Sequence, residues 1–256
     1  MKEFQELVDI LSRLRDPVSG CPWDAKQTSR SLVPNFIEEL YEAVEAIEDN
    51  DPHALCEELG DLLLHIVFQA RIAEEEGKFD IREVLSKISA KLIRRHPHVF
   101  GDADVRDSEA VKLNWERIKK AEKTDRISVL EGIPRALPAL IHAQRSQEKA
   151  AAVGFDWSSV NPVLDKLREE EGEFHAALAS QDSAAIREEL GDMLFTLVNL
   201  ARKLHIDAEG ALKETTRKFH RRFRYIEEHY RQNGANIHEA SLEELDALWN
   251  LAKEDQ

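Results

Sequence analysis

The stretch "EELGDLLLH", Glu57 to His65, places three acidic residues directly before an apolar run, and it returns 131 residues later as "EELGDMLFT", Glu188 to Thr196. A second acidic motif, "EE" followed by a further Glu, occurs at 38–42 and again at 169–173, with the same offset. Repetition at a fixed offset is the signature of an internal duplication. The chain of 256 residues is therefore predicted to consist of two copies of one unit, residues 1–124 and 125–256.

Each copy is predicted to be helical. The 10 glycines and 8 prolines lie mostly between segments, and no series of alternating strand patterns occurs. Apolar residues at helical spacing predict helices over 2–15, 31–48, 54–76 and 81–95, and over 161–179, 184–204 and 208–231 in the second copy. The expected fold is all-α, with two tandem four-helix-bundle-like domains. A helix hairpin is thin for a free-standing core, so we expect the domains to pack in a homodimer.

Composition limits the class of function. A net charge of −15 argues against a nucleic-acid-binding protein. Small anionic substrates remain compatible with this charge where metal ions or a basic cluster offset the negative potential of the protein. No apolar run approaches the roughly 20 residues that span a bilayer, and the first residues lack the apolar core of a signal peptide. We expect a cytoplasmic protein without a membrane partner.

The repeated acids lie in pairs, three residues apart on each of two successive helices. They are Glu39, Glu42, Glu58 and Asp61 in the first copy, and Glu170, Glu173, Glu189 and Asp192 in the second. Residues i and i+3 share a helix face, so a hairpin of the two helices gathers four carboxylates. The repulsion in such a group is relieved either by protonation or by a divalent cation, and oxygen-only ligands favour Mg²⁺, with Mn²⁺ possible.

Two other interpretations of these acids are open. An acid pair on a helix is common on solvated surfaces, but here an apolar run follows, and Gly and Asp, both poor helix formers, recur in both copies. A di-iron carboxylate bundle places Glu-x-x-His on two of its helices, whereas this chain has Asp61 and Asp192 at the equivalent positions. His65 lies one turn further on, but its repeat counterpart is Thr196, so we interpret His65 as a packing residue.

The fourth helix of each copy carries basic pairs four residues apart, Lys91 with Arg95 and Lys218 with Arg222. In an acidic chain these are candidate phosphate-binding residues, because Arg offers a bidentate donor fork and Lys a compact charge. The alternative is a solvated surface that pairs with the many acids.

Together with these acids, the segments "CPWDAKQT" at 21–28, "KLIRRHPHVF", "GIPRALPAL" and "VGFDW" resemble the MazG family of all-α NTP pyrophosphatases, over essentially the whole chain. The resemblance implies Mg²⁺-dependent hydrolysis of a nucleoside triphosphate to the monophosphate and pyrophosphate by a dimer, with the second copy as the main catalytic domain. Lys218, Arg222 and Trp249 match its nucleotide-binding positions.

Further roles follow as hypotheses from this resemblance. Glu169, with Glu38 as its counterpart in the first copy, is the candidate base that accepts a proton from the attacking water. Trp249 is either a stacking platform for the base, which predicts broad nucleobase tolerance, or a core residue of the last helix. The alternative function is a nucleotide-binding regulatory or scaffold protein without turnover, and one copy alone is a candidate for a purely structural role.

Overall fold

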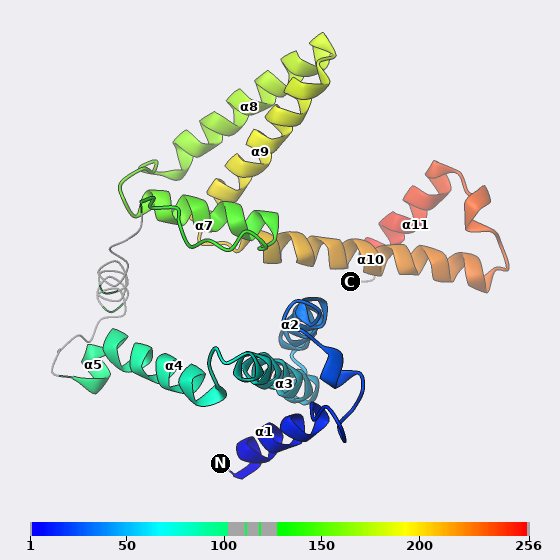
Figure 1. The fold of residues 1–256 in the computed structure, drawn as a ribbon. Helices are drawn as coiled ribbons and strands as arrows, with labels where there is room; N and C mark the ends of the chain where they lie inside the picture. Colours follow the sequence, from blue (N-terminus) through cyan, green and yellow to red (C-terminus); the bar gives the residue numbers. More distant parts are fainter. Residues whose placement is uncertain (1, 102–110, 112–117, 119–126, 255–256) are drawn as a thin grey trace. The chain divides into compact units, whose positions relative to one another are not determined.

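The computed structural model describes residues 2–101, 111, 118 and 127–254, and within these ranges the chain forms helices and no strand (Figure 1). Contacts divide the chain into two units, Met1–Thr124 and Asp125–Gln256. The first unit contains α1 (Lys2–Leu14), η1 (Asp24–Lys26), α2 (Val33–Glu48), α3 (Pro52–Glu75), α4 (Ile81–Arg95) and α5 (Pro97–Phe100). The second contains α7 (Ala139–Ala151), α8 (Val160–Ser180), α9 (Ser183–Lys203), α10 (Ala208–Gln232), η2 (Ile237–Glu239) and α11 (Leu242–Glu254). The predicted all-α class is confirmed.

Each unit is organised around a helix hairpin, α2–α3 in the first and α8–α9 in the second. Both hairpins turn in the same way. Asn50 and Gln181 take left-handed backbone conformations, with φ of 53° and 56°. The following residue, Asp51 or Asp182, accepts hydrogen bonds from backbone N–H groups of the first turn of the next helix. An N-terminal Asp cap satisfies N–H groups that the helix itself leaves unpaired, so the repeated sequence fixes the repeated turn.

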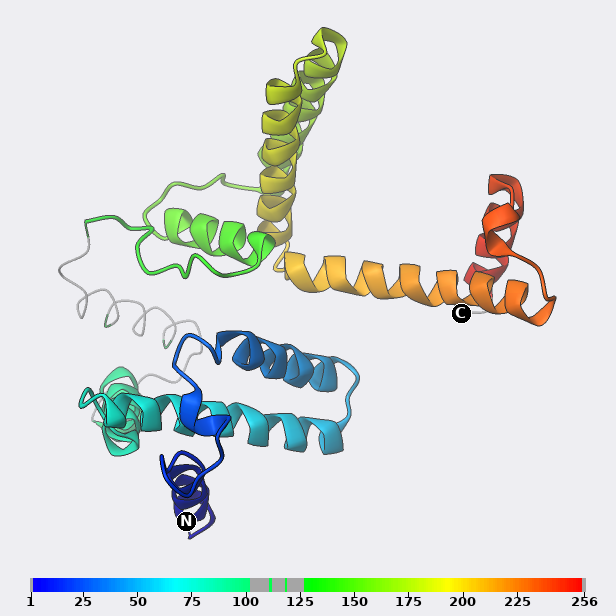
Figure 2. The ribbon, with the colours of Figure 1, turned by 45° about the vertical axis from the view of Figure 1, so that its right-hand side comes forward.

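The first unit buries its core where α1 packs on the later half of α3. Leu11, Leu32, Val67, Phe68 and Ile72 form this core. The acidic half of α3 lies further from α1, along the part of the helix that pairs with α2 (Figure 2). The core therefore holds one end of the hairpin and leaves the acidic segment open to solvent on one side.

The second unit repeats this arrangement, with α7 packed on α9 and Val163 and Val198 buried at the repeat positions of Leu32 and Val67. From the end of α9, α10 runs away from the α8–α9 hairpin, and α11 folds back along its far half (Figures 1 and 2). Ile226, Leu248 and Ala252 are buried where α10 meets α11.

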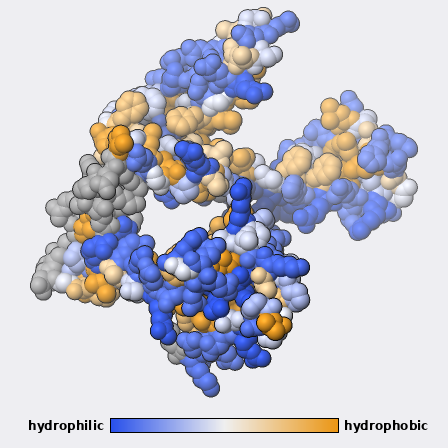
Figure 3. Space-filling view, viewed as in Figure 1, coloured by the Kyte–Doolittle hydropathy of each residue, from blue (hydrophilic) through white to orange (hydrophobic). Residues whose placement is uncertain are grey.

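Many large apolar side chains of both hairpins are exposed in the single chain, and Figure 3 shows hydrophobic areas between hydrophilic ones on both units. Those on α2 include Val33, Ile37, Leu40 and Tyr41, and those on α9 include Leu190, Leu194, Phe195 and Leu197. The helical spacing of the α2 residues predicts a buried face, but within one chain α3 covers only part of it. Over the described residues, the longest helices are too polar to cross a bilayer.

Candidate functional site

The first hairpin brings three of the four predicted acids together. Carboxylate oxygens of Glu39, from α2, and of Glu58 and Asp61, from α3, all lie within 4.8 Å of one another. Glu42 is the fourth predicted acid; it is outside this group, but its charge acts on Glu58. The two antiparallel helices thus gather three of the four acids that were predicted to meet, and Glu42 lies outside the group.

The second hairpin does the same with Glu170 and Glu173 from α8 and Glu189 from α9, whose carboxylate oxygens also lie within 4.8 Å of one another. Glu170 is the buried member, 5% exposed. Asp192 is not part of this group, although its charge acts on Glu189. Both hairpins therefore gather three carboxylates, two of which, Glu39 with Glu170 and Glu58 with Glu189, are repeat counterparts, while the third comes from α3 in the first copy and from α8 in the second.

Burial, together with repulsion between the carboxylates, raises the pKa of several members of the two groups. Burial, and then the charges of Asp61 and Glu42, raise the pKa of Glu39. Burial, followed by the charges of Glu42 and Asp61, raises the pKa of Glu58. In the second copy, burial and then the charge of Glu173 raise the pKa of Glu189. A site that penalises its own ionised state in this way favours a cation.

The geometry fits a divalent metal ion. Ligand oxygens around an octahedral Mg²⁺, at about 2.1 Å from the ion, lie about 3–4 Å apart. The carboxylate oxygens, within 4.8 Å, need only a small closure to reach that spacing. Glu39, Glu58 and Asp61 are the residues of the first copy that would hold an ion, and Glu170, Glu173 and Glu189 those of the second. A hard, all-oxygen donor set matches Mg²⁺ or Mn²⁺ better than iron or zinc.

A lysine that the sequence interpretation missed belongs to the second group only. Lys166, one turn before the acids on α8, places its Nζ 2.7 Å from Glu169 Oε1 and 2.8 Å from Glu170 Oε1. Hydrogen bonds to Glu169 and then to Glu170 raise its pKa above the ordinary value. The signal was available in the spacing, since Lys166 lies at i−3 and i−4 from the two acids. In the first copy the equivalent residue is Asn35.

Ion pairs stabilise the open end of each hairpin, opposite its turn, and the two copies use different residues for this. In the first unit, Arg15 at the end of α1 forms an ion pair of 2.6 Å with Glu75 of α3 and donates hydrogen bonds to the carbonyls of Asp24 and Gln27. In the second unit, Asp156, before α8, pairs with Arg202 at 2.5 Å and with Lys203 at 2.6 Å, both at the end of α9. Each link ties the segment before the first acidic helix to the end of the second.

The predicted phosphate-binding residues of the second unit lie on α10, away from the acids. Glu189 is about 20 Å from the end of α9, and Lys218 about 15 Å along α10, at about 1.5 Å per residue. Because α10 runs away from the hairpin, one chain does not bring Lys218 and Arg222 to the acids (Figure 1). Within α10 and α11, however, Trp249 lies 5.2 Å from the ring of Phe219, and the Arg222 guanidinium lies 5.6 Å from the Trp249 ring. Arg222 and Trp249 thus form one half-buried surface.

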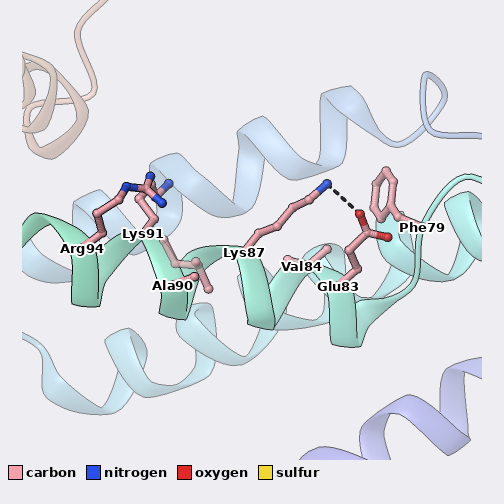
Figure 4. A pocket seen from close by; sticks show the side chains of 8 residues that line it. Phe79, Glu83, Val84, Lys87, Ala90, Lys91 and Arg94 are labelled. Carbon is pink, nitrogen blue, oxygen red and sulfur yellow. Dashed lines mark ion pairs between the residues drawn. The ribbon is translucent and has the colours of Figure 1, made fainter. Parts of the chain in front are cut away.

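The corresponding helix of the first unit, α4, carries a shallow cavity of about 570 Å³. Its lining residues are Phe79, Glu83, Val84, Lys87, Ile88, Ala90, Lys91 and Arg94. In Figure 4, Lys87 reaches Glu83, an ion pair of 2.7 Å, while Lys91 and Arg94 lie at the other end of the cavity. The second predicted residue, Arg95, is not among the lining residues. α4 begins beyond the end of α3 that is remote from Glu58 and Asp61, and it leads away from the hairpin (Figure 1).

The structure also shows where His65 and Glu38 of the first copy lie. His65 is buried and stacks on Phe36, with 5.5 Å between ring centroids, and it lies outside the acidic group, as a packing residue would. Burial lowers its pKa. Glu38 is exposed on α2 beside Glu39.

Comparison with known proteins gives the context for this geometry. The family model described as "MazG nucleotide pyrophosphohydrolase domain" matches residues 27–100 and again 159–226, so each match contains one acidic hairpin. A protein of Escherichia coli named nucleoside triphosphate pyrophosphohydrolase is 44% identical over 100% of this chain and 99% of its own length. A Thermotoga maritima protein named nucleoside triphosphate pyrophosphohydrolase/pyrophosphatase MazG is 46% identical over 98% of this chain and 95% of its own.

Among solved structures, a mazG-related protein from Thermotoga maritima is 27% identical and covers 47% of this chain and 99% of its own, with a TM-score of 0.40.

Proposed function

The chain belongs to the MazG nucleotide pyrophosphohydrolase family, and from this premise we propose that it hydrolyses nucleoside triphosphates to the monophosphate and pyrophosphate with Mg²⁺ at the acidic group of the second hairpin. The observation that carries the proposal is the convergence of Glu170, Glu173 and Glu189 within 4.8 Å. The relatives that match over nearly their whole length carry pyrophosphohydrolase names. Mn²⁺ is the expected substitute ion.

The chain's own residues define the steps. Glu170, Glu173 and Glu189 would hold the ion, with Asp192 proposed as a fourth ligand, and the ion would supply charge neutralisation of the phosphates and activation of water. Glu169, next to Glu170 on α8, would accept a proton from a water molecule as the oxygen of that water attacks the α-phosphorus in line. The bond from that phosphorus to the bridging oxygen breaks, and pyrophosphate leaves with the electron pair.

Lys218 and Arg222 are proposed to stabilise charge on the phosphoryl oxygens. Trp249, which lies beside Arg222, is proposed to stack on the base. A stacked base is recognised through its π-face, which every base has, so broad nucleobase tolerance is expected. In the first copy, Glu38, Lys91 and Arg95 are the corresponding candidates.

The separation of α10 from the acids supports a homodimer, because one chain keeps the basic residues of α10 away from the acids and leaves apolar side chains of the hairpins exposed. A second chain packed on these faces would bury apolar surface, and each Å² buried stabilises the dimer by about 25 cal/mol. Light scattering is expected to give about twice the chain mass of 29.3 kDa. A monomer at micromolar concentration would refute the dimer.

The activity test compares pyrophosphate release from several NTPs by the wild type, Glu173→Gln and Glu42→Gln, with EDTA as a further control. Glu173→Gln removes one ligand charge at nearly unchanged volume and is expected to lower kcat at least about a hundredfold, whereas Glu42→Gln retains most activity. Full activity of Glu173→Gln would overturn the assignment of the second hairpin. Loss of activity in a folded Glu42→Gln variant would show that both copies contribute.

The second candidate function, nucleotide binding without turnover, is tested by the same assays. Intact acids in both hairpins favour hydrolysis, because binding alone does not require two such groups. Binding of NTP without release of orthophosphate or pyrophosphate would favour the regulatory alternative.

A further inference from the structure

The two acidic groups differ in one charge that lies directly on them. Lys166 reaches the carboxylate of Glu170 at 2.8 Å, and that carboxylate belongs to the group that gathers around the proposed ion. At the same position in the first copy stands Asn35, which is neutral. Both groups lie on a helix hairpin and share two repeat pairs, Glu39 with Glu170 and Glu58 with Glu189; the third carboxylate is Asp61 in the first group and Glu173 in the second.

The position of Lys166 makes it a competitor for the ion. The Glu170 side chain is 6% exposed, so its carboxylate has few water partners, and the ammonium supplies the cation that a buried carboxylate requires. A metal ion that binds the same oxygen must displace this ammonium, whose side chain is 34% exposed and therefore borders solvent. Displacement loses two short ion pairs, to Glu169 and to Glu170.

The first group lacks this compensation. Carboxylate oxygens of Glu39, the counterpart of Glu170, and of Glu58 and Asp61 lie within 4.8 Å of one another, and the neutral Asn35 stands where the second copy has Lys166. An ion that enters the first group therefore relieves repulsion without displacing a lysine.

We propose that Lys166 is a built-in cation of the second site, which weakens metal binding there in the nucleotide-free protein, so that the first site holds a divalent ion on its own and the second takes up its ion together with the polyphosphate. This inference rests on the proposed function, because it concerns the same two metal groups. The polyphosphate matters because an ammonium displaced from Glu170 regains an anionic neighbour only when such a ligand is bound. Metal and NTP then bind cooperatively at the second site.

The test measures Mn²⁺ binding to nucleotide-free protein by the electron paramagnetic resonance signal of the free ion. The second site is isolated in a background of Glu39→Gln and Glu58→Gln. There, Lys166→Gln is expected to tighten Mn²⁺ binding about tenfold, since it removes one positive charge in contact with a ligand oxygen. Lys166→Arg, which keeps the charge, is expected to stay near the starting affinity.

Arg168→Gln is the matched control. It removes the same charge from the same helix, but Arg168 pairs at the surface with Asp165, at 2.6 Å and with both side chains more than two thirds exposed. Its effect on Mn²⁺ affinity is expected to stay below about twofold, because exposed charges are screened. An equal gain in Arg168→Gln and Lys166→Gln would assign the effect to net charge and overturn the inference.

A reciprocal variant tests the first site. In a background of Glu170→Gln and Glu173→Gln, Asn35→Lys is expected to weaken Mn²⁺ binding at the first group about tenfold. A non-hydrolysable NTP analogue is expected to strengthen Mn²⁺ binding at the second site several-fold more with Lys166 present than in Lys166→Gln.

The possible failures are distinguishable. If Mn²⁺ binds at both groups but is indifferent to Lys166 and to Asn35→Lys, this inference fails and the proposed function stands. If millimolar Mn²⁺ binds at neither group, with or without nucleotide, the metal sites of the proposed function fail, and this inference fails with them.

Discussion

Substituting Asp156 by Asn tests the link that holds the open end of the second hairpin. Asp156 accepts hydrogen bonds from Arg202 and Lys203 at the end of α9, and Lys203 also donates to the carbonyl of Trp157. Asn preserves the size of the side chain but removes the charge. The two cations, with side chains 12% and 15% exposed, then lose their carboxylate.

The expected loss of stability follows from the lowered pKa of Asp156. Its hydrogen bond from Arg202, and then that from Lys203, lower the pKa from 3.8 to about 2. One pKa unit corresponds to about 1.4 kcal/mol, so the interactions of the ionised form are worth about 2.5 kcal/mol. The Asp156 side chain is 22% exposed, and solvent screening reduces this value. We expect Asp156→Asn to lower the free energy of unfolding of the second unit by about 2 kcal/mol at pH 7.

The dependence on pH has a defined sign. Because the pKa of Asp156 is lower in the folded state than in the unfolded state, the stabilisation is fully present above about pH 5 and is lost as the pH falls through 3.8 toward about 2. Urea unfolding followed by circular dichroism at pH 7, 5, 4 and 3 measures the gap between wild type and variant. That gap is expected to be constant down to about pH 5 and to shrink below about pH 4.

Asp165→Asn is the matched control, because Asp165 pairs with Arg168 on the surface, with side chains 74% and 69% exposed. We expect it to change the stability by less than about 0.5 kcal/mol. The reasoning is refuted if Asp156→Asn and Asp165→Asn have equal effects, or if the deficit of Asp156→Asn is the same at pH 3 as at pH 7.

Two further predictions concern the first unit. Arg15→Met keeps much of the packing over Phe68 but leaves Glu75 without Arg15 and the carbonyls of Asp24 and Gln27 without their donor, so urea unfolding is expected to show a loss of about 3 kcal/mol; a loss under about 1 kcal/mol contradicts it. Glu39, whose pKa is raised by burial and by Asp61, destabilises the metal-free unit above that pKa and is relieved as the pH falls through it. When the pH of an EDTA-containing solution is lowered from 7 to about 5, the melting temperature should therefore rise more for the wild type than for Glu39→Gln. Saturating Mg²⁺ should abolish this difference. Equal shifts in the two proteins would argue against repulsion.

Much of the fold and part of the site were predictable from the sequence. Helix periodicity and the offset of 131 residues locate the hairpins, and the Asp caps at 51 and 182 confirm their turns. The i, i+3 spacing of Glu58 and Asp61, set against Glu39 on the preceding helix, is enough to predict that carboxylates converge, because two paired helices leave few alternatives.

The sequence alone could not assign the charges that surround this group. From the sequence, Lys166 is one more charged residue on the surface of α8. The structure shows that its partner Glu170 is buried. The ion pairs Arg15–Glu75 and Asp156–Arg202 join residues that are 60 and 46 positions apart. The two copies therefore stabilise the same end of the hairpin with different residues. No local pattern distinguishes these pairs from the many other acids and bases of the chain.

The sequence by itself determined the helices, their duplication and the grouping of acids on each hairpin, because caps, periodicity and spacing act within a few residues of one another. Only the tertiary structure decided that Glu170, the partner of Lys166, is buried, and that α10 carries Lys218 and Arg222 away from the acids within one chain. The physical reason is that these arrangements depend on how whole helices leave their turns and on which carboxylates packing removes from water, and neither is encoded in a short stretch of residues.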